Sequence, residues 1–187
     1  MRETLHAAAA IRSKPGIVSI RLGGKILSGE WGDRRGDVFA KVAIAALKHG
    51  QTELVEQSLD QVQYPLTRGL LLCDLADAER EGGNLGAGRR WMDEARRLVA
   101  SATWKASRTQ LQSRIVESLV GMGRLEEAAD IDRAAGDENV KRVHAVALAK
   151  AGRYEAALKL VEGIKSPDVR AMGITQMATK MLGAQQK

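Results

Sequence analysis

The sequence is short of aromatic residues, proline and cysteine. Among its 187 residues there are three Trp, two Tyr, one Phe, three Pro and one Cys. A single cysteine excludes a fold held together by internal disulfides, and no apolar run approaches the roughly 20 residues of a membrane-spanning helix. With 44% apolar and 28% charged residues, the composition is that of a folded domain and excludes a disordered or collagen-like chain.

Cys73 and the net charge of the chain bear on its cellular compartment and on the charge of its partners. Cys73 lies in an apolar run, so we expect a small buried hydrophobic residue and a reducing, cytoplasmic setting. The apolar stretch of residues 7–10 is too short for a secretory signal, and we interpret it as part of a helix of the mature protein. The net charge is +6, and the basic excess lies mainly in residues 94–187, which weakly favours acidic partners.

Apolar residues recur at helical spacing along most of the chain. Val38, Val42 and Ala46 form one such set, and Leu111, Ile115 and Leu119 form another. Gly or Pro interrupts the pattern about once per helix length. From residue 37 onward the sequence therefore predicts helices only.

The segments 122–129 and 151–158 form the clearest internal repeat. They match at Gly, Arg, Glu and one Ala with an offset of 29 residues, and weaker copies occur at Gly50 and Gly83, with Gly16 and Gly183 as further candidates. A glycine suits this place because the first helix must end in a left-handed residue before the chain reverses. The small residue five positions later, Ala128 or Ala157, would let two helices approach closely.

On these residues, the chain resembles the tetratricopeptide-like superfamily of α-helical repeats over residues 37–183. The family's turn glycine, second-helix alanine and large first-helix residue fall on Gly123 and Gly152, Ala128 and Ala157, and Leu119 and Leu148. The resemblance implies an all-α fold, a right-handed superhelical array of antiparallel helix pairs, with residues 37–187 as the helical-repeat domain. Repeat lengths vary, and Gly88 stands where one alanine is expected. Another helical repeat or a helical bundle stays an alternative.

Residues 1–36 carry the weakest pattern. We expect an irregular N-terminal helical pair or extension, although residues 17–22 are as compatible with a short strand. Residues 30–37 are predicted to form a loop, with Asp37 as the N-cap of a helix that begins at Val38.

No residue pattern indicates catalysis or a cofactor. His6, His49 and His144 are too far apart for a zinc site, and we interpret His49 as a capping residue and His144 as a packed one. The glycine-rich residues 82–88 match no phosphate-binding motif. We therefore expect no enzyme activity, no metal and no cofactor.

Binding is the function that a helical array implies, because its first helices line an extended concave groove. The groove positions implied by the resemblance are Gln110, Ser113, Glu117, Asn139, Arg142, Val146, Lys150, Arg170, Met177 and Lys180. Four of these residues are basic, which predicts an acidic, partly hydrophobic protein or peptide partner, with Arg142 best placed for a carboxylate. The chain would then be a non-enzymatic adaptor or chaperone-like module.

Two further hypotheses remain open. A nucleic-acid-binding helical repeat would use a basic set with interleaved aromatic residues, Arg89, Arg90, Trp91, Arg96, Arg97 and Lys105, unless the tryptophans merely pack between helices. The last helix, residues 169–182, carries Ile174, Met177, Met181 and Leu182. Either a second copy or another protein covers them, or they face the preceding helix pair.

Overall fold

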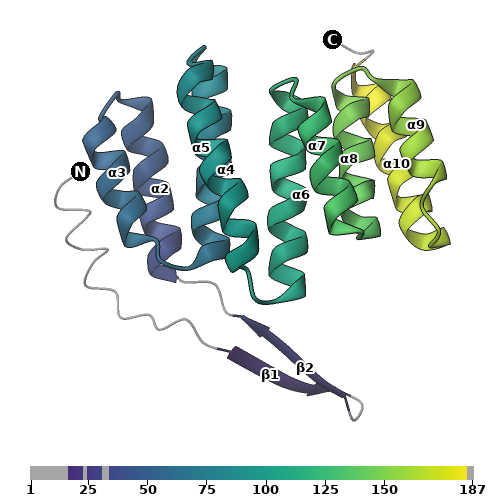
Figure 1. Cartoon of the computed structure of the whole chain (residues 1–187), viewed down its shortest axis with the longest axis horizontal. Helices are drawn as coiled ribbons and strands as arrows, with labels where there is room; N and C mark the ends of the chain where they lie inside the picture. The colour runs from purple at the N-terminus through teal and green to yellow at the C-terminus, as the bar shows by residue number, and fades with distance from the viewer. Residues whose placement is uncertain (1–16, 23–24, 31–33, 185–187) are drawn as a thin grey trace. The chain divides into compact units, whose positions relative to one another are not determined.

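A computed structural model of the chain describes residues 17–22, 25–30 and 34–184. The chain divides into two compact units, residues 1–108 (unit 1) and residues 109–187 (unit 2). The elements are β1 (Ile17–Leu22), β2 (Lys25–Glu30), α2 (Arg34–Lys48), α3 (Thr52–Gln61), α4 (Pro65–Glu81), α5 (Leu85–Leu98), the short 3-10 helix η1 (Val99–Ser101), α6 (Lys105–Gly121), α7 (Leu125–Ala135), α8 (Glu138–Lys150), α9 (Tyr154–Glu162) and α10 (Pro167–Ala184). Within each unit, consecutive helices run in opposite directions (Figure 1).

The N-terminal helical pair is wrong for residues 17–22 and 25–30, which form two antiparallel β-strands. Ile17 lies opposite Glu30, and Leu22 lies opposite Lys25. The physical reason is local: β1 is rich in β-branched residues, which favour strands, and the Gly-Gly pair that follows in the sequence is unfavourable inside a helix. The predicted helix and the candidate turn within residues 1–16 lie outside the described residues.

The loop predicted for residues 30–37 is wrong over its last four residues, because α2 begins at Arg34. Asp37 lies in the first turn of α2 instead of capping it. A carboxylate there interacts favourably with the partial positive charge of the helix N-terminus, so the same residue suits either position.

From Arg34 to Ala184 the described elements are all helices, as predicted. Four turn glycines have positive φ, Gly50 at 66°, Gly83 at 82°, Gly123 at 74° and Gly152 at 75°. In each turn the next residue donates its amide to the carbonyl five positions earlier: Gln51 to Ala46 and Arg124 to Leu119 at 2.9 Å, Asn84 to Glu79 and Arg153 to Leu148 at 2.8 Å. This pattern is a Schellman motif, so the predicted left-handed helix caps are confirmed.

The residue five positions after each turn glycine is buried in all four turns, namely Val55, Gly88, Ala128 and Ala157. The two alanines therefore lie where the sequence places a close helix contact. The turn considered at Gly183 is not formed, because α10 continues through that residue to Ala184. A glycine inside a helix costs only about 1 kcal/mol relative to alanine.

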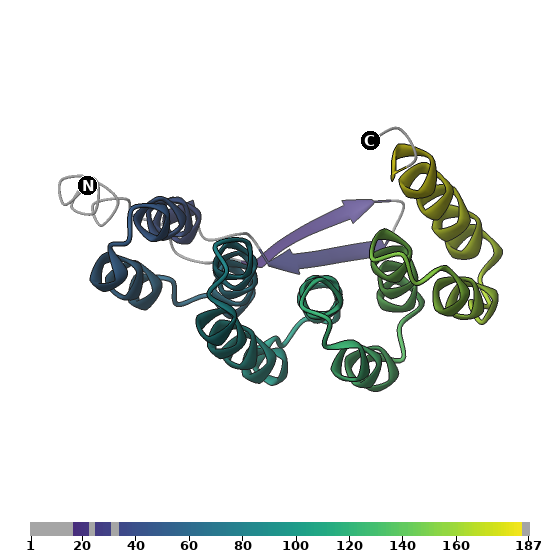
Figure 2. The same ribbon diagram turned by 90° about the horizontal axis from the view of Figure 1, so that it is seen from above.

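Helices pack in the same way within each unit. We call the helix before a turn glycine a first helix and the helix after it a second helix. In unit 1, α2 packs on α3, α4 packs on α5, and the first helices α2 and α4 contact each other, so that the view in Figure 2 shows two layers. In unit 2, α8 packs on α7, α9 and α10.

Each unit has its own apolar core. The fully buried side chains include Phe39, Leu71, Leu72, Leu75 and Met92 in unit 1, and Leu111, Ile115, Leu119 and Ile164 in unit 2. Cys73 is buried, as predicted for a small hydrophobic residue. Within the described ranges, no helix combines the length and hydropathy that a membrane span requires.

Candidate functional site

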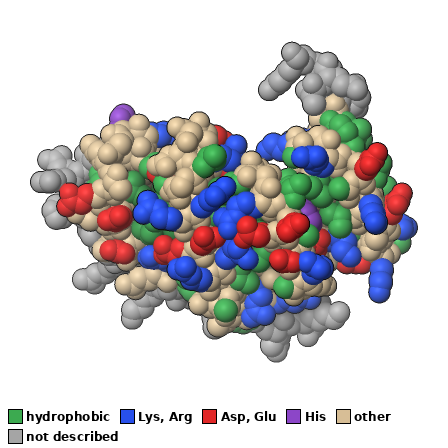
Figure 3. All heavy atoms as spheres, turned by 45° about the horizontal axis from the view of Figure 1, so that its top comes forward, with side chains coloured by type: hydrophobic (Ala, Val, Ile, Leu, Met, Phe, Trp, Pro, Cys, Tyr) green, Lys and Arg blue, Asp and Glu red, His purple; other side chains and the backbone are tan. Residues whose placement is uncertain are grey.

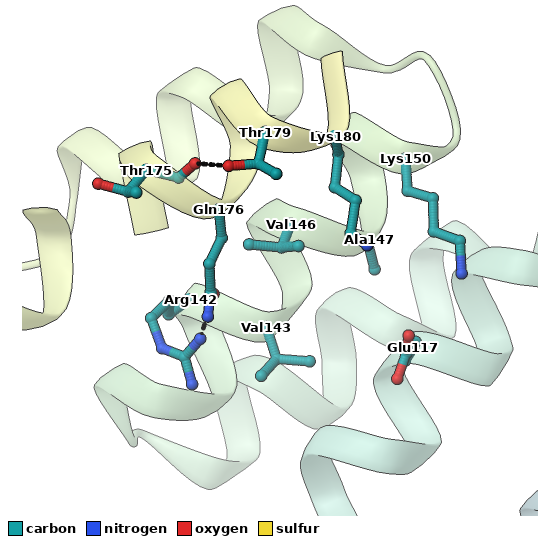
Figure 4. Close-up of a pocket in the computed structure, with 10 residues that line it drawn as sticks. All are labelled: Glu117, Arg142, Val143, Val146, Ala147, Lys150, Thr175, Gln176, Thr179 and Lys180. Carbon is teal, nitrogen blue, oxygen red and sulfur yellow. Dashed lines mark hydrogen bonds between the residues drawn. The ribbon is translucent and has the colours of Figure 1, made fainter. Parts of the chain in front are cut away.

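Unit 2 contains a pocket of about 440 Å³ between the first helix α8 and helix α10, with one residue from α6. Figure 4 shows the ten residues that line it: Glu117, Arg142, Val143, Val146, Ala147, Lys150, Thr175, Gln176, Thr179 and Lys180. Five of the groove positions implied by the resemblance thus meet in one pocket: Glu117, Arg142, Val146, Lys150 and Lys180.

The floor of the pocket is apolar and comes from α8. Val143, Val146 and Ala147 recur at helical spacing, so their side chains share one face of the helix. On α10, the Thr175 hydroxyl donates to the Ala171 carbonyl at 3.0 Å and the Thr179 hydroxyl to the Thr175 carbonyl at 2.9 Å. Each hydroxyl proton is therefore engaged by the backbone of α10 itself.

Three cations and one carboxylate surround this floor. Lys150 and Lys180 are exposed and Arg142 is half-buried, and Glu117 is the only acidic lining residue. Within the described part of the chain, none of these four groups takes part in an ion pair. The pocket therefore has an excess of positive charge that no side chain of the described protein neutralises.

Arg142 is held at one end of the pocket. Its Nη1 donates to the side-chain oxygen of Gln176 on α10, and its Nε is buried without a hydrogen-bond partner among the described residues. In Figure 4 the two valines lie between Arg142 and the lysines. The pocket thus has a cationic group at either end and an apolar centre.

Gly173 lets α10 approach α8 and α9 closely enough to form this wall. A Cβ atom at Gly173 would lie 2.7 Å from Cγ2 of Val161 and 3.4 Å from Cγ of Arg142. Real Cβ atoms do not tolerate the first distance, so any larger residue would push α10 away from α9.

The start of α10 is fixed by a side chain from α8. The Glu138 carboxylate accepts hydrogen bonds from the backbone amides of Lys165 at 2.7 Å and Ser166 at 3.1 Å. Amides at a helix N-terminus have no partner within the helix, so the carboxylate satisfies donors that would otherwise need water. Sequence reasoning missed this contact, which joins residues 27 positions apart.

A buried hydrogen-bonded pair joins α7 to α8. Asp132 Oδ2 lies 3.0 Å from His144 Nδ1, and the two residues are only 5% and 3% exposed. Asp132 Oδ1 is buried with no hydrogen-bond partner in the described chain. The sequence predicts His144 as a packed residue, which is confirmed, but its partner on the preceding helix was not anticipated.

The remaining groove positions lie outside the pocket. Asn139 and Arg170 are exposed in the first turns of α8 and α10, and Gln110 and Ser113 lie on α6 without lining the cavity. Met177 is only 3% exposed and belongs to the core of unit 2. On the same helix, Ile174 is 52% exposed and Met181 is 38% exposed, so part of α10 faces the preceding pair and part does not.

The arginine and tryptophan segment lines a different pocket, in unit 1. This cavity of about 490 Å³ contains Arg90, Trp91 and Arg97 together with four carboxylates, Glu56, Glu79, Asp93 and Glu94. Trp91 is half-buried, and Arg96 lies 4.0 Å from the carboxylate of Asp93. Arg89 and Lys105 are exposed but do not line the cavity. On the face drawn in Figure 3, basic and acidic side chains are interleaved.

No protein-family model matches the chain, and neither the curated proteins nor the solved structures include a significant match.

Among the described residues, no group of His, Cys, Asp and Glu side chains is arranged to hold a metal ion.

Proposed function

We propose that the chain is a non-enzymatic protein-interaction module, an adaptor or chaperone-like protein, that binds an acidic, partly apolar segment of a partner in the α8–α10 pocket. One observation carries the proposal: Arg142, Lys150 and Lys180 surround an apolar floor, and none of them is paired with a carboxylate in the described chain. Carboxylates of a partner would supply the missing counter-charges.

The spacing of the cations suggests how a segment would lie. Arg142 and Lys150 are eight residues apart on one helix, which corresponds to roughly 12 Å along its axis. A segment with carboxylates near its two ends and an apolar side chain between them would contact both cations and the valine floor. Glu117 would repel a uniformly acidic segment and accept hydrogen bonds from its amides.

The four equivalent glycine turns support the finer fold assignment, a right-handed superhelical array of tetratricopeptide-like helix pairs. The buried thiol of Cys73 supports a reducing, cytoplasmic setting for this binding.

Nucleic-acid binding is the second candidate, and the exposed Arg89, Arg90 and Arg97 beside Trp91 favour it. The four carboxylates in the same cavity oppose it, because they repel phosphates. An oligonucleotide of mixed sequence at low salt is the direct test. Binding that weakens steeply as salt rises would favour this candidate over the peptide proposal.

The test of the peptide proposal uses a fluorescein-labelled peptide of repeated glutamate, leucine and serine, with fluorescence anisotropy as the readout. We expect Arg142→Glu combined with Lys150→Glu to weaken binding in the α8–α10 pocket at least about tenfold, which is about 1.4 kcal/mol. Arg89→Glu combined with Lys159→Glu is the matched control, because both side chains are exposed outside the pocket and the net charge changes equally. Equal affinities for the two double variants would contradict the proposal.

A further inference from the structure

A second pocket lies on the first helices of unit 1. This cavity of about 350 Å³ is lined by Ala40, Lys41, Ile44, Ala45 and Lys48 of α2 and by Asp74 of α4. It is distinct from the cavity around Trp91, with which it shares no lining residue. None of the sequence patterns pointed to it.

The two first-helix pockets occupy the same positions relative to their turn glycines. Counted back from Gly50, the α2 lining residues stand at positions 10, 9, 6, 5 and 2. The α8 lining residues of the other pocket stand at the same five positions before Gly152. The equivalent pairs include Ile44 and Val146, Ala45 and Ala147, and Lys48 and Lys150, so the apolar floor and its terminal lysine recur together.

The charges correspond at one end only: Lys48 is equivalent to Lys150, whereas Lys41 is equivalent to Val143, and Arg142 is equivalent to Ala40. Lys41 and Lys48 are both exposed, and within the described ranges neither forms an ion pair. They are seven residues apart on one helix face, roughly 10 Å along the axis. Asp74 comes from the adjacent first helix α4, as Glu117 comes from α6 in the other pocket. Each pocket thus combines an excess of cations, an apolar floor and one carboxylate from another first helix.

This combination is not a general property of the first helices. At the same five positions α4 carries Cys73, Asp74, Asp77, Ala78 and Glu81, and α6 carries Ser113, Arg114, Glu117, Ser118 and Gly121. A lysine two positions before the turn glycine therefore occurs in α2 and α8 but not in α4 or α6. The two pockets are therefore alike in the residues that line them as well as in their position relative to the turn glycine.

We infer that the α2 pocket is a second binding site for the same ligand class, an acidic and apolar peptide segment, so that one chain binds two such segments. The ligand class rests on the proposed function of the α8–α10 pocket. The location rests independently on the α2 residues, whose two lysines supply the charge complementarity. A partner with two acidic segments, or two partners, would be bound by one chain.

Titration calorimetry on the full chain tests the inference with the same peptide of glutamate, leucine and serine. We expect two peptides per chain for the unsubstituted protein. Lys41→Glu combined with Lys48→Glu should leave one peptide per chain, as should Arg142→Glu combined with Lys150→Glu. Arg89→Glu combined with Lys159→Glu is the control outside both pockets and should leave two.

The outcomes separate the two proposals. One peptide per chain, lost on substitution of Arg142 and Lys150 but unaffected at Lys41 and Lys48, overturns this inference and leaves the proposed function standing. Binding lost only at Lys41 and Lys48 supports the α2 site and overturns the α8–α10 site. No binding at millimolar peptide overturns both. Far-ultraviolet circular dichroism checks the fold of each variant, and Lys41→Gln with Lys48→Gln repeats the test without charge reversal, with a loss of about threefold or more in affinity expected at that site.

Discussion

The α8–α10 pocket of unit 2 and the Trp91 pocket of unit 1 differ in how their cations are neutralised. Two arginines of the Trp91 pocket share it with four carboxylates, and neighbouring arginines are paired, Arg68 with Glu94 at 2.9 Å and Arg96 with Asp93. The three cations of the α8–α10 pocket have one carboxylate nearby and no ion pair in the described chain. The Trp91 pocket has nearly as many basic residues, two against three, so the pairing of the charges distinguishes the two pockets more than their number does.

The two units also differ in where paired side chains lie: His144 and Asp132 are buried and join two helices, whereas Arg96 and Asp93 are partly exposed and lie within α5. His144→Ala tests this difference with the largest expected effect. The substitution leaves the Asp132 carboxylate buried without its partner, so we expect the free energy of unfolding to fall by about 3 kcal/mol. Arg96→Ala in unit 1 removes a partly exposed pair and should cost less than about 1 kcal/mol. Urea denaturation followed by circular dichroism measures both, and similar losses would remove this distinction.

Gly173→Ala tests whether the pocket of unit 2 depends on the close packing of α10. The added methyl group overpacks the contact with Val161, and we expect a loss of about 2 kcal/mol together with weaker peptide binding to unit 2. Gly86→Ala in α5 is the control, because its Cβ has nothing within 4 Å and its φ is not positive. There we expect a gain of up to about 1 kcal/mol, since alanine stabilises a helix. A stable Gly173→Ala protein with full affinity would show that the close approach is dispensable.

Charge reversal in the Trp91 pocket tests the pairing argument itself. Arg90→Glu combined with Arg97→Glu should change the affinity for the acidic peptide by less than about twofold. The same reversal at Arg142 and Lys150 should weaken it at least about tenfold. Anisotropy titrations at two salt concentrations measure both. A tenfold loss of affinity in the Arg90 and Arg97 variant would mean that the carboxylates of that pocket do not neutralise its arginines.

The smallest expected effect comes from Glu138→Gln, which keeps an acceptor but removes the negative charge at the start of α10. We expect a loss of about 1 kcal/mol in the free energy of unfolding. Peptide affinity should fall by about twofold or threefold, because α10 carries one wall of the pocket. Glu155→Gln, in the exposed first turn of α9, should change stability by less than about 0.5 kcal/mol. If both variants lose the same stability and affinity, the contact of Glu138 with the amides of Lys165 and Ser166 does not position α10.

Local patterns in the sequence predict much of this architecture. Gly123 and Gly152 mark their turns because a left-handed helix cap is a local requirement, and the neighbouring residues repeat with it. The strands at residues 17–22 and 25–30 do not follow from the sequence for the opposite reason, since six residues with mixed spacing fit a strand or half a helix equally well.

The candidate site is predictable only in part. The side chains on the pocket face of α8, such as Arg142 and Lys150, follow from helix periodicity and the repeat. The contacts that position the surrounding helices do not, because Glu138 meets Lys165 and Asp132 meets His144 only after distant segments have packed. The α2 pocket was likewise not predicted from the sequence, because it forms only where Asp74 of α4 lies beside the lining residues of α2.

The four turn glycines have one further consequence, which concerns chirality. A Cβ atom at Gly50, Gly83, Gly123 or Gly152 would meet nothing within 4 Å, so space does not exclude a side chain there. What excludes an L-residue is the positive φ, which costs roughly 1 kcal/mol or more per residue of L-configuration. A D-alanine has the opposite preference and favours positive φ. In a chemically synthesised chain, D-alanine at these four turns would restrict the unfolded backbone while keeping every turn in its native geometry.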